Sequence, residues 1–547
     1  MVQGMIPDLF VILSLGVAVA FLAVAARRLR AAPSILMLLA GVALAFVPNL
    51  PPVALKPDLL FLLFLPPLLY NSGVNMSWRS FRSNLRPILA LAIGCVLFTA
   101  AAVAAVAHFA LGLSWPVGFV LGAIVSPPDA VAPIALLRRM RLPQRLITIL
   151  EGESLVNDAT ALVAFSFALG AVATGTFSPA AATAQFAMIV IGELAYGIAV
   201  GWGMLRLRHY ARDPRAEVLL ALVTPFIAFW LPHEVGGSGV VACVAAGLYV
   251  SWNGRKLIRP DTRLQGYFIW NIVTWVVEAL IFLLTGLQAR AIAGSLSAAD
   301  WMQLLQAGAL ITLTIIIVRF VWVFSYIHLP RLLLRVLRWD DPQPDWRVPF
   351  MVGFTGLRGV VSLAAALSIP IALGDQPFPD RDLVLFITFF VIVATLVGLG
   401  SLLSFVARRI GLEGAGRDEA VKEKRYERAA RLKGIRAALK ELERAEAEGE
   451  PAISVAALRR YHADRLALLT TTADETTPDE PATDAARLQL RLVGAERLAI
   501  MRLYEENRIS DEARRRIERE LDLEEARSQH ARASSSSANA SGGDPGR

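Results

Sequence analysis

The sequence predicts an all-α polytopic membrane protein of about 13 transmembrane helices, followed by a helical cytoplasmic tail. Of its 547 residues, 55% are hydrophobic. Apolar runs separated by short basic loops continue to about Phe405, and a span needs about 20 mostly apolar residues. From about Glu413 the composition changes to Ala, Glu and Arg. We therefore expect a transmembrane domain at 1–412, a helical tail at 413–533 and a disordered end at 534–547.

Short loops connect the predicted spans in sequence. Some spans are shorter than average, which flanking anchors and helix tilt can accommodate. The predicted spans are Leu9–Ala25, Ser34–Val47, Leu59–Leu69, Ile88–Leu111, Val117–Leu137, Leu146–Thr174, Gln185–Leu205, Val218–Leu231, Gly239–Val250, Phe268–Leu287, Met302–Phe324, Val348–Leu373 and Leu383–Phe405.

The loop charges indicate an odd number of spans, because cytoplasmic loops hold most of the lysines and arginines of a membrane protein. Of the 54 basic residues, 25 lie after Leu412, and 24 of the others fall in alternate loops. Only Lys56, Arg290 and Arg381 fall in the remaining loops. This pattern predicts an external amino terminus and a cytoplasmic tail. The net charge of +8 reflects the same bias and does not indicate nucleic-acid binding.

The segment Glu151–Val163 opens a hydrophobic span, yet it carries three carboxylates within its first eight residues. An isolated charge at the bilayer centre costs about 3 kcal/mol on insertion scales, so acids there are candidate functional groups. On a helix, Ser154 and Asp158 share one face, and Glu153 and Asn157 share the neighbouring face. The segment therefore presents two different polar pairs to the elements that pack against it.

Two spans are predicted to be broken helices that cross. The fifth span holds Ser126–Pro133, and its three prolines cannot remain in a regular helix. Asp129 lies in this break, near the middle of the span. The twelfth span holds Gly353–Ser362, in which three glycines surround Arg358. The two spans run in opposite directions, which indicates inverted-topology repeats, and such breaks are typical of the binding sites of transporters.

Acids outnumber bases among the charged residues within the spans. These residues are Asp129, Glu151, Glu153, Asp158, Glu193 and Glu278, against Arg319 and Arg358. Left ionised and unpaired, the excess acids would cost on the order of 10 kcal/mol, comparable with the stability of a whole fold. They must therefore be protonated, bind cations or reach water. This excess favours the handling of cations or protons over the transport of anions.

Some of these charges also have a structural interpretation. Two explanations fit Glu153 and Arg358 equally well. They could form a buried ion pair that joins two helices, or they could have a functional role. For Glu278 and Arg319 we prefer the interpretation that they form a structural ion pair. For Asp129 and Asp158 we prefer a functional role, because a neutral Asn would pack as well at lower cost. The pattern assigns no role to Glu193.

The motifs resemble those of the bacterial, electroneutral branch of the monovalent cation/proton antiporter superfamily, the sodium/proton exchangers. The resemblance covers nearly the whole membrane part. It depends on Gly152–Asp158, Ser126–Ala132, Gly356–Gly359, Ser238–Ala242 and Ala246–Leu248.

The resemblance implies a homodimer of thirteen-helix protomers in the bacterial inner membrane, which exchange Na⁺, Li⁺ or K⁺ for protons in pH and cation homeostasis. It implies that Asp158 is the main cation and proton carrier and that Asp129 and Ser154 complete a Na⁺ site with backbone oxygen and water. It also implies that Asn157 belongs to an electroneutral site. Glu153 and Arg358 would form a stabilising ion pair.

One residue departs from the family pattern. Many relatives have Thr-Asp-Pro where this chain has Pro128-Asp129-Ala130. Pro128 has no hydroxyl group, so it can offer only its carbonyl oxygen to a cation.

Because burial disfavours the charged form of a carboxylate, the interpretation also predicts transport that depends steeply on pH.

Two other classes of protein remain as alternatives. A cation channel or proton-leak pathway usually has a repeated or symmetric filter, whereas this chain has one asymmetric cluster of acids. An intramembrane aspartyl protease would use two Asp residues on adjacent spans, but Pro-Pro-Asp and Asn-Asp do not resemble its motifs. The sequence indicates a transporter that needs no cofactor and is not an enzyme.

The tail is predicted to be a set of charged helices. We expect helices at 418–450, 454–469, 485–504 and 511–532, with a polar linker at 470–484. The tail contains no phosphate-binding loop, zinc-ligand spacing or catalytic triad. Regulation, subunit association and a simple solvated appendage all remain open for it.

Overall fold

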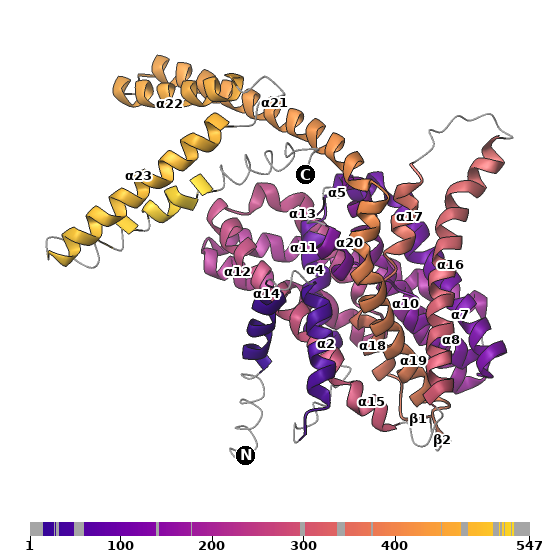
Figure 1. Cartoon of the computed structure of the whole chain (residues 1–547). Helices are drawn as coiled ribbons and strands as arrows, with labels where there is room; N and C mark the ends of the chain where they lie inside the picture. The colour runs from indigo at the N-terminus through magenta and orange to yellow at the C-terminus, as the bar shows by residue number, and fades with distance from the viewer. Residues whose placement is uncertain are drawn as a thin grey trace. The chain divides into compact units, whose positions relative to one another are not determined.

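Helices make up almost all of the regular structure in the described part of the computed structural model, with one two-stranded hairpin, β1 (Ala372–Leu373) and β2 (Gln376–Pro377) (Figure 1). The chain divides into two units, Met1–Glu419 and Ala420–Arg547. The structure describes residues 15–26, 28, 32–48, 60–137, 140, 142–176, 178–295, 301–335, 345–373, 376–449, 451–471, 480–506, 514, 517, 518, 520–526, 528 and 529.

The first unit is an all-helical membrane domain. Seven helices among the described residues are long and apolar enough to cross a membrane. These are Leu85–Leu111, Gln144–Thr174, Ala182–Ala211, Pro214–Glu234, Thr262–Gly294, Trp301–Ile327 and Arg381–Arg409. Shorter apolar helices occupy Leu15–Ala26, Pro33–Ala45, Trp115–Val125 and Val240–Gly254. The expected helices are therefore present at the seven long spans and at these four shorter positions.

The helices of this unit follow the order of the predicted spans. Their bounds are α2 (Pro33–Ala45), α4 (Leu65–Asn75), α5 (Trp78–Ser83), α6 (Leu85–Leu89), α7 (Val96–Leu111), α8 (Trp115–Val125), α9 (Val131–Leu137), α10 (Gln144–Thr174), α11 (Pro179–Ala211), α12 (Pro214–Glu234), α13 (Val240–Leu257), α14 (Pro260–Leu287), α15 (Ala289–Ser295), α16 (Trp301–Arg335), α17 (Arg347–Phe354), α18 (Val360–Leu367), α19 (Arg381–Val393) and α20 (Gly400–Arg409). Three π-helical segments, η1 (Leu60–Phe64), η2 (Ala90–Cys95) and η3 (Ala394–Leu399), lead into α4, α7 and α20.

The third span differs from its predicted form. It contains two prolines, Pro66 and Pro67, which lie in the first turn of α4, directly after the π-helical segment η1. Proline is tolerated there because the first amides of a helix have no partner within it. The helix therefore continues to Asn75, six residues beyond the predicted end of the span.

Helix α10 is central to the packing of the unit. Its first turns pack in a cluster with Met351 and Leu403, and its middle, at Leu155, packs with α4 and α13. Its later turns, at Phe165, join the cluster formed by α8, α16 and α19. A single helix thus contributes to three apolar clusters, and this packing fixes the direction in which each of its polar residues points.

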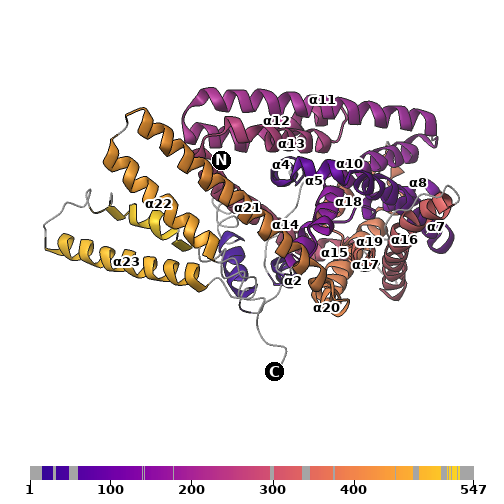
Figure 2. The same ribbon diagram turned by 90° about the horizontal axis from the view of Figure 1, so that it is seen from above.

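Small residues allow some helices to pack closely. At the crossing of α2 and α14, a methyl group on Gly41 would lie only 2.9 Å from the Cα atom of Gly286. Close backbone approach at small residues is the usual way in which membrane helices associate. Figure 2 shows α11, α12 and α13 lying side by side as another helical group, and each packs against the other two.

The second unit contains the helical tail. Helix α21 (Leu412–Ala447) begins in the first unit and continues into the second, which also holds α22 (Ala452–Thr471) and α23 (Glu480–Glu505). The described residues between 514 and 529 are helical and pair with α23, where Arg497 bridges Asp522 and Glu525. Helices are therefore present at the predicted positions 485–504 and, over its described residues, 511–532. The segment 534–547, expected to be disordered, lies outside the described residues.

Candidate functional site

The break in the fifth span is built from two prolines and an aspartate. Helix α8 ends at Val125, and α9 begins at Val131. The Asp129 carboxylate accepts a hydrogen bond from the amide of Val131 at 2.9 Å, so it satisfies one of the free donors at the start of α9. The amide of Asp129 donates to the carbonyl oxygen of Leu357 at 2.7 Å. The break is therefore fixed both to its own helix and to the twelfth span.

The twelfth span is broken where its glycines predicted a break. Helix α17 ends at Phe354 and α18 begins at Val360. The Arg358 side chain donates through Nη1 to the carbonyl oxygen of Ser126 at 2.8 Å, and its amide donates to Thr395 Oγ1 at 3.0 Å. The two broken segments therefore contact each other directly.

Gly359 is required at this contact. A methyl group added to it would lie 2.6 Å from the Cγ atom of Asp129, well inside van der Waals contact. The absence of a side chain therefore lets the second break lie against the carboxylate of the first. This close approach is one physical reason for the glycine-rich sequence of the twelfth span.

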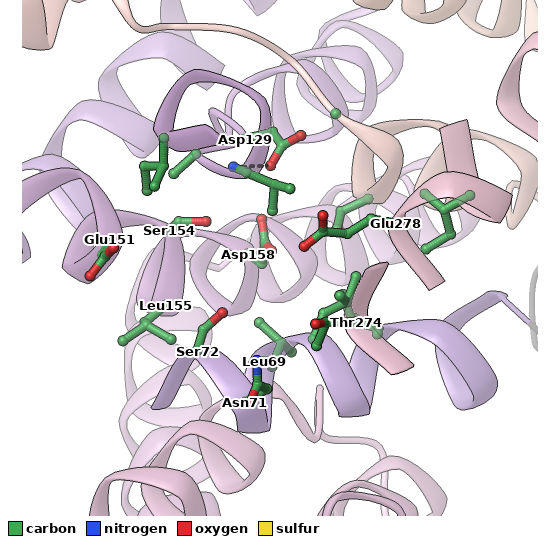
Figure 3. A pocket seen from close by; sticks show the side chains of 18 of the residues that line it. Leu69, Asn71, Ser72, Asp129, Glu151, Ser154, Leu155, Asp158, Thr274 and Glu278 are labelled. Atoms are coloured by element: carbon green, nitrogen blue, oxygen red, sulfur yellow. Dashed lines mark hydrogen bonds between the residues drawn. The ribbon is translucent and has the colours of Figure 1, made fainter. Parts of the chain in front are cut away.

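A cavity of about 360 Å³ lies beside these breaks. Four carboxylates of the described residues line it: Asp129 from the fifth span, Glu151 and Asp158 from α10, and Glu278 from α14 (Figure 3). Ser154 lies one turn before Asp158 on α10 and lines the same cavity. The structure thus brings together the three residues that were expected to hold a cation, namely Asp129, Ser154 and Asp158. Carboxylate and hydroxyl oxygens are the ligands that hard cations prefer.

Asp158 is buried, with 8% of its surface exposed. Among the described residues, no side chain or amide donates a hydrogen bond to its carboxylate. In this respect it differs from Asp129, whose carboxylate accepts from Val131. The oxygens of Asp158 are therefore available to a proton, a cation or water.

Asn157 and Pro128 lie behind this site. The Asn157 Nδ2 group donates to the carbonyl oxygen of Pro128 at 2.6 Å. Neither residue is one of the described residues that line the main cavity. Pro128 instead lines a small adjoining pocket together with Glu153 and Arg319. Its carbonyl oxygen, which was expected to face a cation, thus accepts from Asn157. The two residues join α10 to the break beside it.

Known proteins identify the family of this chain. Residues 15–409 match the family described as sodium/hydrogen exchanger, transmembrane. The chain belongs to the sodium/hydrogen exchanger family. It is therefore a multi-pass membrane protein and an antiporter rather than an enzyme, as the motifs predicted.

Several known proteins are similar to this chain. An uncharacterized Na⁺/H⁺ exchanger of Mycobacterium tuberculosis is 34% identical over 533 residues, which are 96% of each chain. A sodium, potassium, lithium and rubidium/H⁺ antiporter of Bacillus pumilus is 32% identical over 495 residues, or 86% of this chain and 70% of the relative. The sodium proton antiporter of Methanocaldococcus jannaschii has a similar fold, with a TM-score of 0.57 at 20% identity, covering 74% of this chain and 99% of that one.

In this exchanger the buried ion pair is not the one that the sequence predicted. Glu153 was expected to pair with Arg358, but it pairs with Arg319 through two contacts of 2.6 and 2.9 Å. Both side chains are only 2% exposed. Arg358 instead bonds the backbone of the opposite break. The expected pairing was wrong because the rotation of α10 directs Glu153 towards α16, which carries Arg319.

The expected pair between Glu278 and Arg319 is also wrong. The Nε group of Arg319 donates to the carbonyl oxygen of Val352 at 3.0 Å, and both terminal nitrogens donate to Glu153. Each of the three nitrogens of this guanidinium therefore has a partner other than Glu278. Glu278 lines the cavity instead, on the side opposite α10 (Figure 3).

Glu193, to which the sequence assigned no role, caps a helix. The residue is 4% exposed, and its carboxylate accepts hydrogen bonds from the amides of Ser238, Gly239 and Val241 at 2.6, 2.9 and 3.1 Å. These amides lie at the start of α13, where helix donors have no intrahelical partner and where negative charge is favourable. Glu193 therefore joins α11 to the amino terminus of α13.

Several further polar residues, to which the sequence assigned no role, also line the cavity. They are Asn71, Ser72, Asn75, Asn271, Thr274 and Ser362. Their spacing was a signal that could have found them, because Asn271, Thr274 and Glu278 follow the same three- and four-residue steps as Glu151, Ser154 and Asp158. Each set therefore forms one polar face on an otherwise apolar helix.

Proposed function

We propose that this exchanger swaps a monovalent cation, Na⁺ first, for a proton at a single site in which Asp158 is the carrier. Asp129 and Ser154 complete the site with backbone oxygen and water. One observation carries the proposal: the three residues line one cavity, and no described residue donates a hydrogen bond to the Asp158 carboxylate. Its oxygens are thus left to an exchangeable partner.

Competition for this carboxylate gives exchange without further machinery. A proton and a hard cation both bind carboxylate oxygen, so the binding of either excludes the other. An ionised, unpaired carboxylate inside a membrane is costly. The loaded forms therefore cross the membrane more readily than the empty ionised form, and this couples the two flows.

We infer an electroneutral exchange from the neutral side chain of Asn157. This amide donates to the carbonyl oxygen of Pro128 and so holds α10 against the break. A carboxylate at the same position would add a second titratable group beside Asp158. With a neutral residue there, one proton replaces one monovalent cation.

Li⁺ and K⁺ are further candidate substrates. The Bacillus pumilus relative is named for sodium, potassium, lithium and rubidium. All of these ions accept the same oxygen ligands, so the ligand types in the cavity exclude none of them. The proposal therefore includes Na⁺, Li⁺ and K⁺.

We propose thirteen spans with inverted-topology repeats for the membrane domain at 1–412. The two broken spans, α8 with α9 and α17 with α18, correspond in the two repeats and cross at their breaks. The loop charges support an external amino terminus and a cytoplasmic helical tail at 413–533. We place the exchanger in a bacterial inner membrane, as the family resemblance implies. The division of the chain after Glu419 is consistent with this arrangement.

We also propose that the exchanger is a homodimer. Helix α11 exposes large apolar side chains over several turns, among them Met188, Ile191 and Trp202, which are 72%, 67% and 54% exposed. Such a face suits lipid or a second copy of the chain. Crosslinking of cysteines introduced on α11, in native membranes, tests the second possibility.

Proton movement in everted membrane vesicles tests the main proposal. Na⁺, Li⁺ or K⁺ is added to vesicles that hold a pH gradient, and an internal dye reports its collapse. We expect cation-dependent collapse for the native chain and none for Asp158→Asn. Asp382→Asn is the matched control, because that carboxylate is 50% exposed on α19, away from the cavity.

An undiminished response in Asp158→Asn would contradict the assignment of the carrier. A response that does not saturate with the cation concentration would favour a channel. The native profile should also change steeply with pH, because protons compete with the cation for one carboxylate.

A further inference from the structure

Glu278 lines the cavity from the wall opposite Asp158. It comes from α14, whereas Asp158 comes from α10, and Figure 3 shows both carboxylates directed into the same space. The structural role expected for it, a pair with Arg319, is excluded because Arg319 is bound by Glu153 and Val352. Glu278 therefore presents its carboxylate to the cavity and not to this guanidinium.

The polar residues around Glu278 mirror those around Asp158. On α14, Asn271, Thr274 and Glu278 all line the cavity, and residues with this spacing share one face of a helix. The hydroxyl group of Thr274 donates to the carbonyl oxygen of Trp270 at 2.8 Å, which leaves its lone pairs available. The α14 wall thus offers oxygen ligands along a path that ends at Glu278.

Ser362 gives an independent indication of a ligand. It lies on α18, which packs against α14, and it lines the same cavity. Only 2% of its surface is exposed, and its hydroxyl oxygen has no hydrogen-bond partner among the described residues. A buried hydroxyl left unsatisfied costs about 1–3 kcal/mol. A cation or a cation-bound water at this point would remove that cost.

The charge of the cavity favours a cation over an anion at this point. The described residues that line it include Asp129, Glu151, Asp158 and Glu278 and no lysine, arginine or histidine. In a partly buried space such charges interact more strongly than they do in bulk water. This lining therefore suits a cation on the wall opposite Asp158 as well.

We propose that Glu278 and Ser362 form a second monovalent-cation subsite, which the ion occupies on its way to Asp158. This inference rests on the proposed function and deepens it. The subsite concentrates the cation next to the carrier, so it lowers the KM for Na⁺. It takes no part in the crossing step, so it leaves the maximal rate unchanged.

Transport kinetics test the subsite. Glu278→Gln keeps the shape of the side chain and removes its charge, and we expect it to raise the KM for Na⁺ about tenfold while the maximal rate stays within about twofold. Glu278→Asp keeps the charge and should stay close to the native KM. Ser362→Ala should raise the KM about threefold to fivefold.

Glu151→Gln is the matched control, because it removes another carboxylate from the same cavity. If the cavity acts only through its total negative charge, Glu151→Gln and Glu278→Gln will raise the KM equally, and the subsite is wrong. A KM that is unchanged in Glu278→Gln, with a lower maximal rate, would likewise show a purely structural residue.

A binding measurement separates this inference from the proposed function. In purified Asp158→Asn the carrier is lost, but the second subsite remains. Na⁺, compared with choline, should therefore still raise the unfolding temperature, and adding Glu278→Gln to the same chain should abolish the effect. If Asp158→Asn shows no stabilisation by Na⁺, or if the double variant keeps it, the subsite does not exist, whatever the transport assay gives.

Discussion

Helix α10 carries two buried acids whose environments differ completely. Glu153 has a dedicated partner, since Arg319 binds both of its oxygens and the side chains of the pair are 2% exposed. Asp158, five residues later, faces a cavity and accepts no hydrogen bond from a described residue. Burial alone therefore does not identify a transport residue. The carboxylate without a built-in partner is the one that can exchange ions.

Glu193 shows a third arrangement. It is as deeply buried as the other two, but backbone amides and the Ser238 hydroxyl group satisfy its oxygens rather than a guanidinium. Glu153 and Glu193 thus both stabilise the structure, by different means. Changes at these two acids should affect stability, whereas changes around Asp158 should affect transport.

The largest expected effect follows from breaking the buried ion pair. Glu153→Gln leaves the Arg319 charge buried without its partner, and this should lower the free energy of unfolding by about 3–5 kcal/mol. Denaturant titration of the purified protein in detergent measures the loss. The comparison would fail if the variant were as stable as the native chain and had lost only transport.

A double variant sharpens this result. Glu153→Met with Arg319→Met removes both charges and keeps similar volumes, so much of the lost stability should return. If the double variant is no more stable than Glu153→Gln, the loss comes from packing at Glu153 rather than from the unpaired charge of Arg319.

The next effect concerns the helix cap. Glu193→Gln removes the charge that the first amides of α13 bind, and we expect a loss of about 1.5–3 kcal/mol in stability with an unchanged KM for Na⁺. Glu234→Gln, at an exposed glutamate at the end of α12, is the matched control and should change neither quantity. A large rise in KM for Glu193→Gln would instead place this acid in the transport path.

Gly359→Ala tests the contact between the two breaks. The added methyl group would meet the Asp129 carboxylate, and overpacking of this kind costs about 1–3 kcal/mol. We expect the cost to appear as weaker Na⁺ binding, because the atom displaced is a proposed ligand. In Gly170→Ala on α10, the added atom would have nothing within 4 Å, so this control should transport normally. Equal behaviour of the two variants would contradict the proposed geometry.

Local chemistry explains what the sequence could predict. The helix breaks at Pro127 and at Gly359 were predicted correctly, because proline and glycine disfavour a regular helix at their own positions. The shared face of Ser154 and Asp158 follows from helix periodicity alone, and the structure places both on one cavity. The family motifs then pointed to the same residues as the physical argument.

The sequence could not predict which charged residues pair when they lie far apart in the chain. Two arginines, Arg319 and Arg358, lie in the spans, and the choice of the one that binds Glu153 depends on how α10 is rotated against α16. That rotation is set by three apolar clusters and not by any local pattern. Because Glu278 was predicted to pair with Arg319, its position on the wall of the cavity was not predicted. The cap by Glu193 was missed for the same reason, since it joins residues 45 or more apart in the chain.

The smallest expected effect concerns the hydroxyl group beside the carrier. Ser154→Ala removes one neutral oxygen ligand, and a hydrogen bond or ligand of this kind contributes about 1 kcal/mol, which corresponds to about a fivefold rise in KM. Ser166→Ala on the same helix is the control, because its hydroxyl donates to the carbonyl oxygen of Leu162 away from the cavity. Stability should not change in either variant. If Ser154→Ala leaves the KM for Na⁺ unaltered, the cation binds Asp158 and Asp129 without this hydroxyl, and water takes its place in the site.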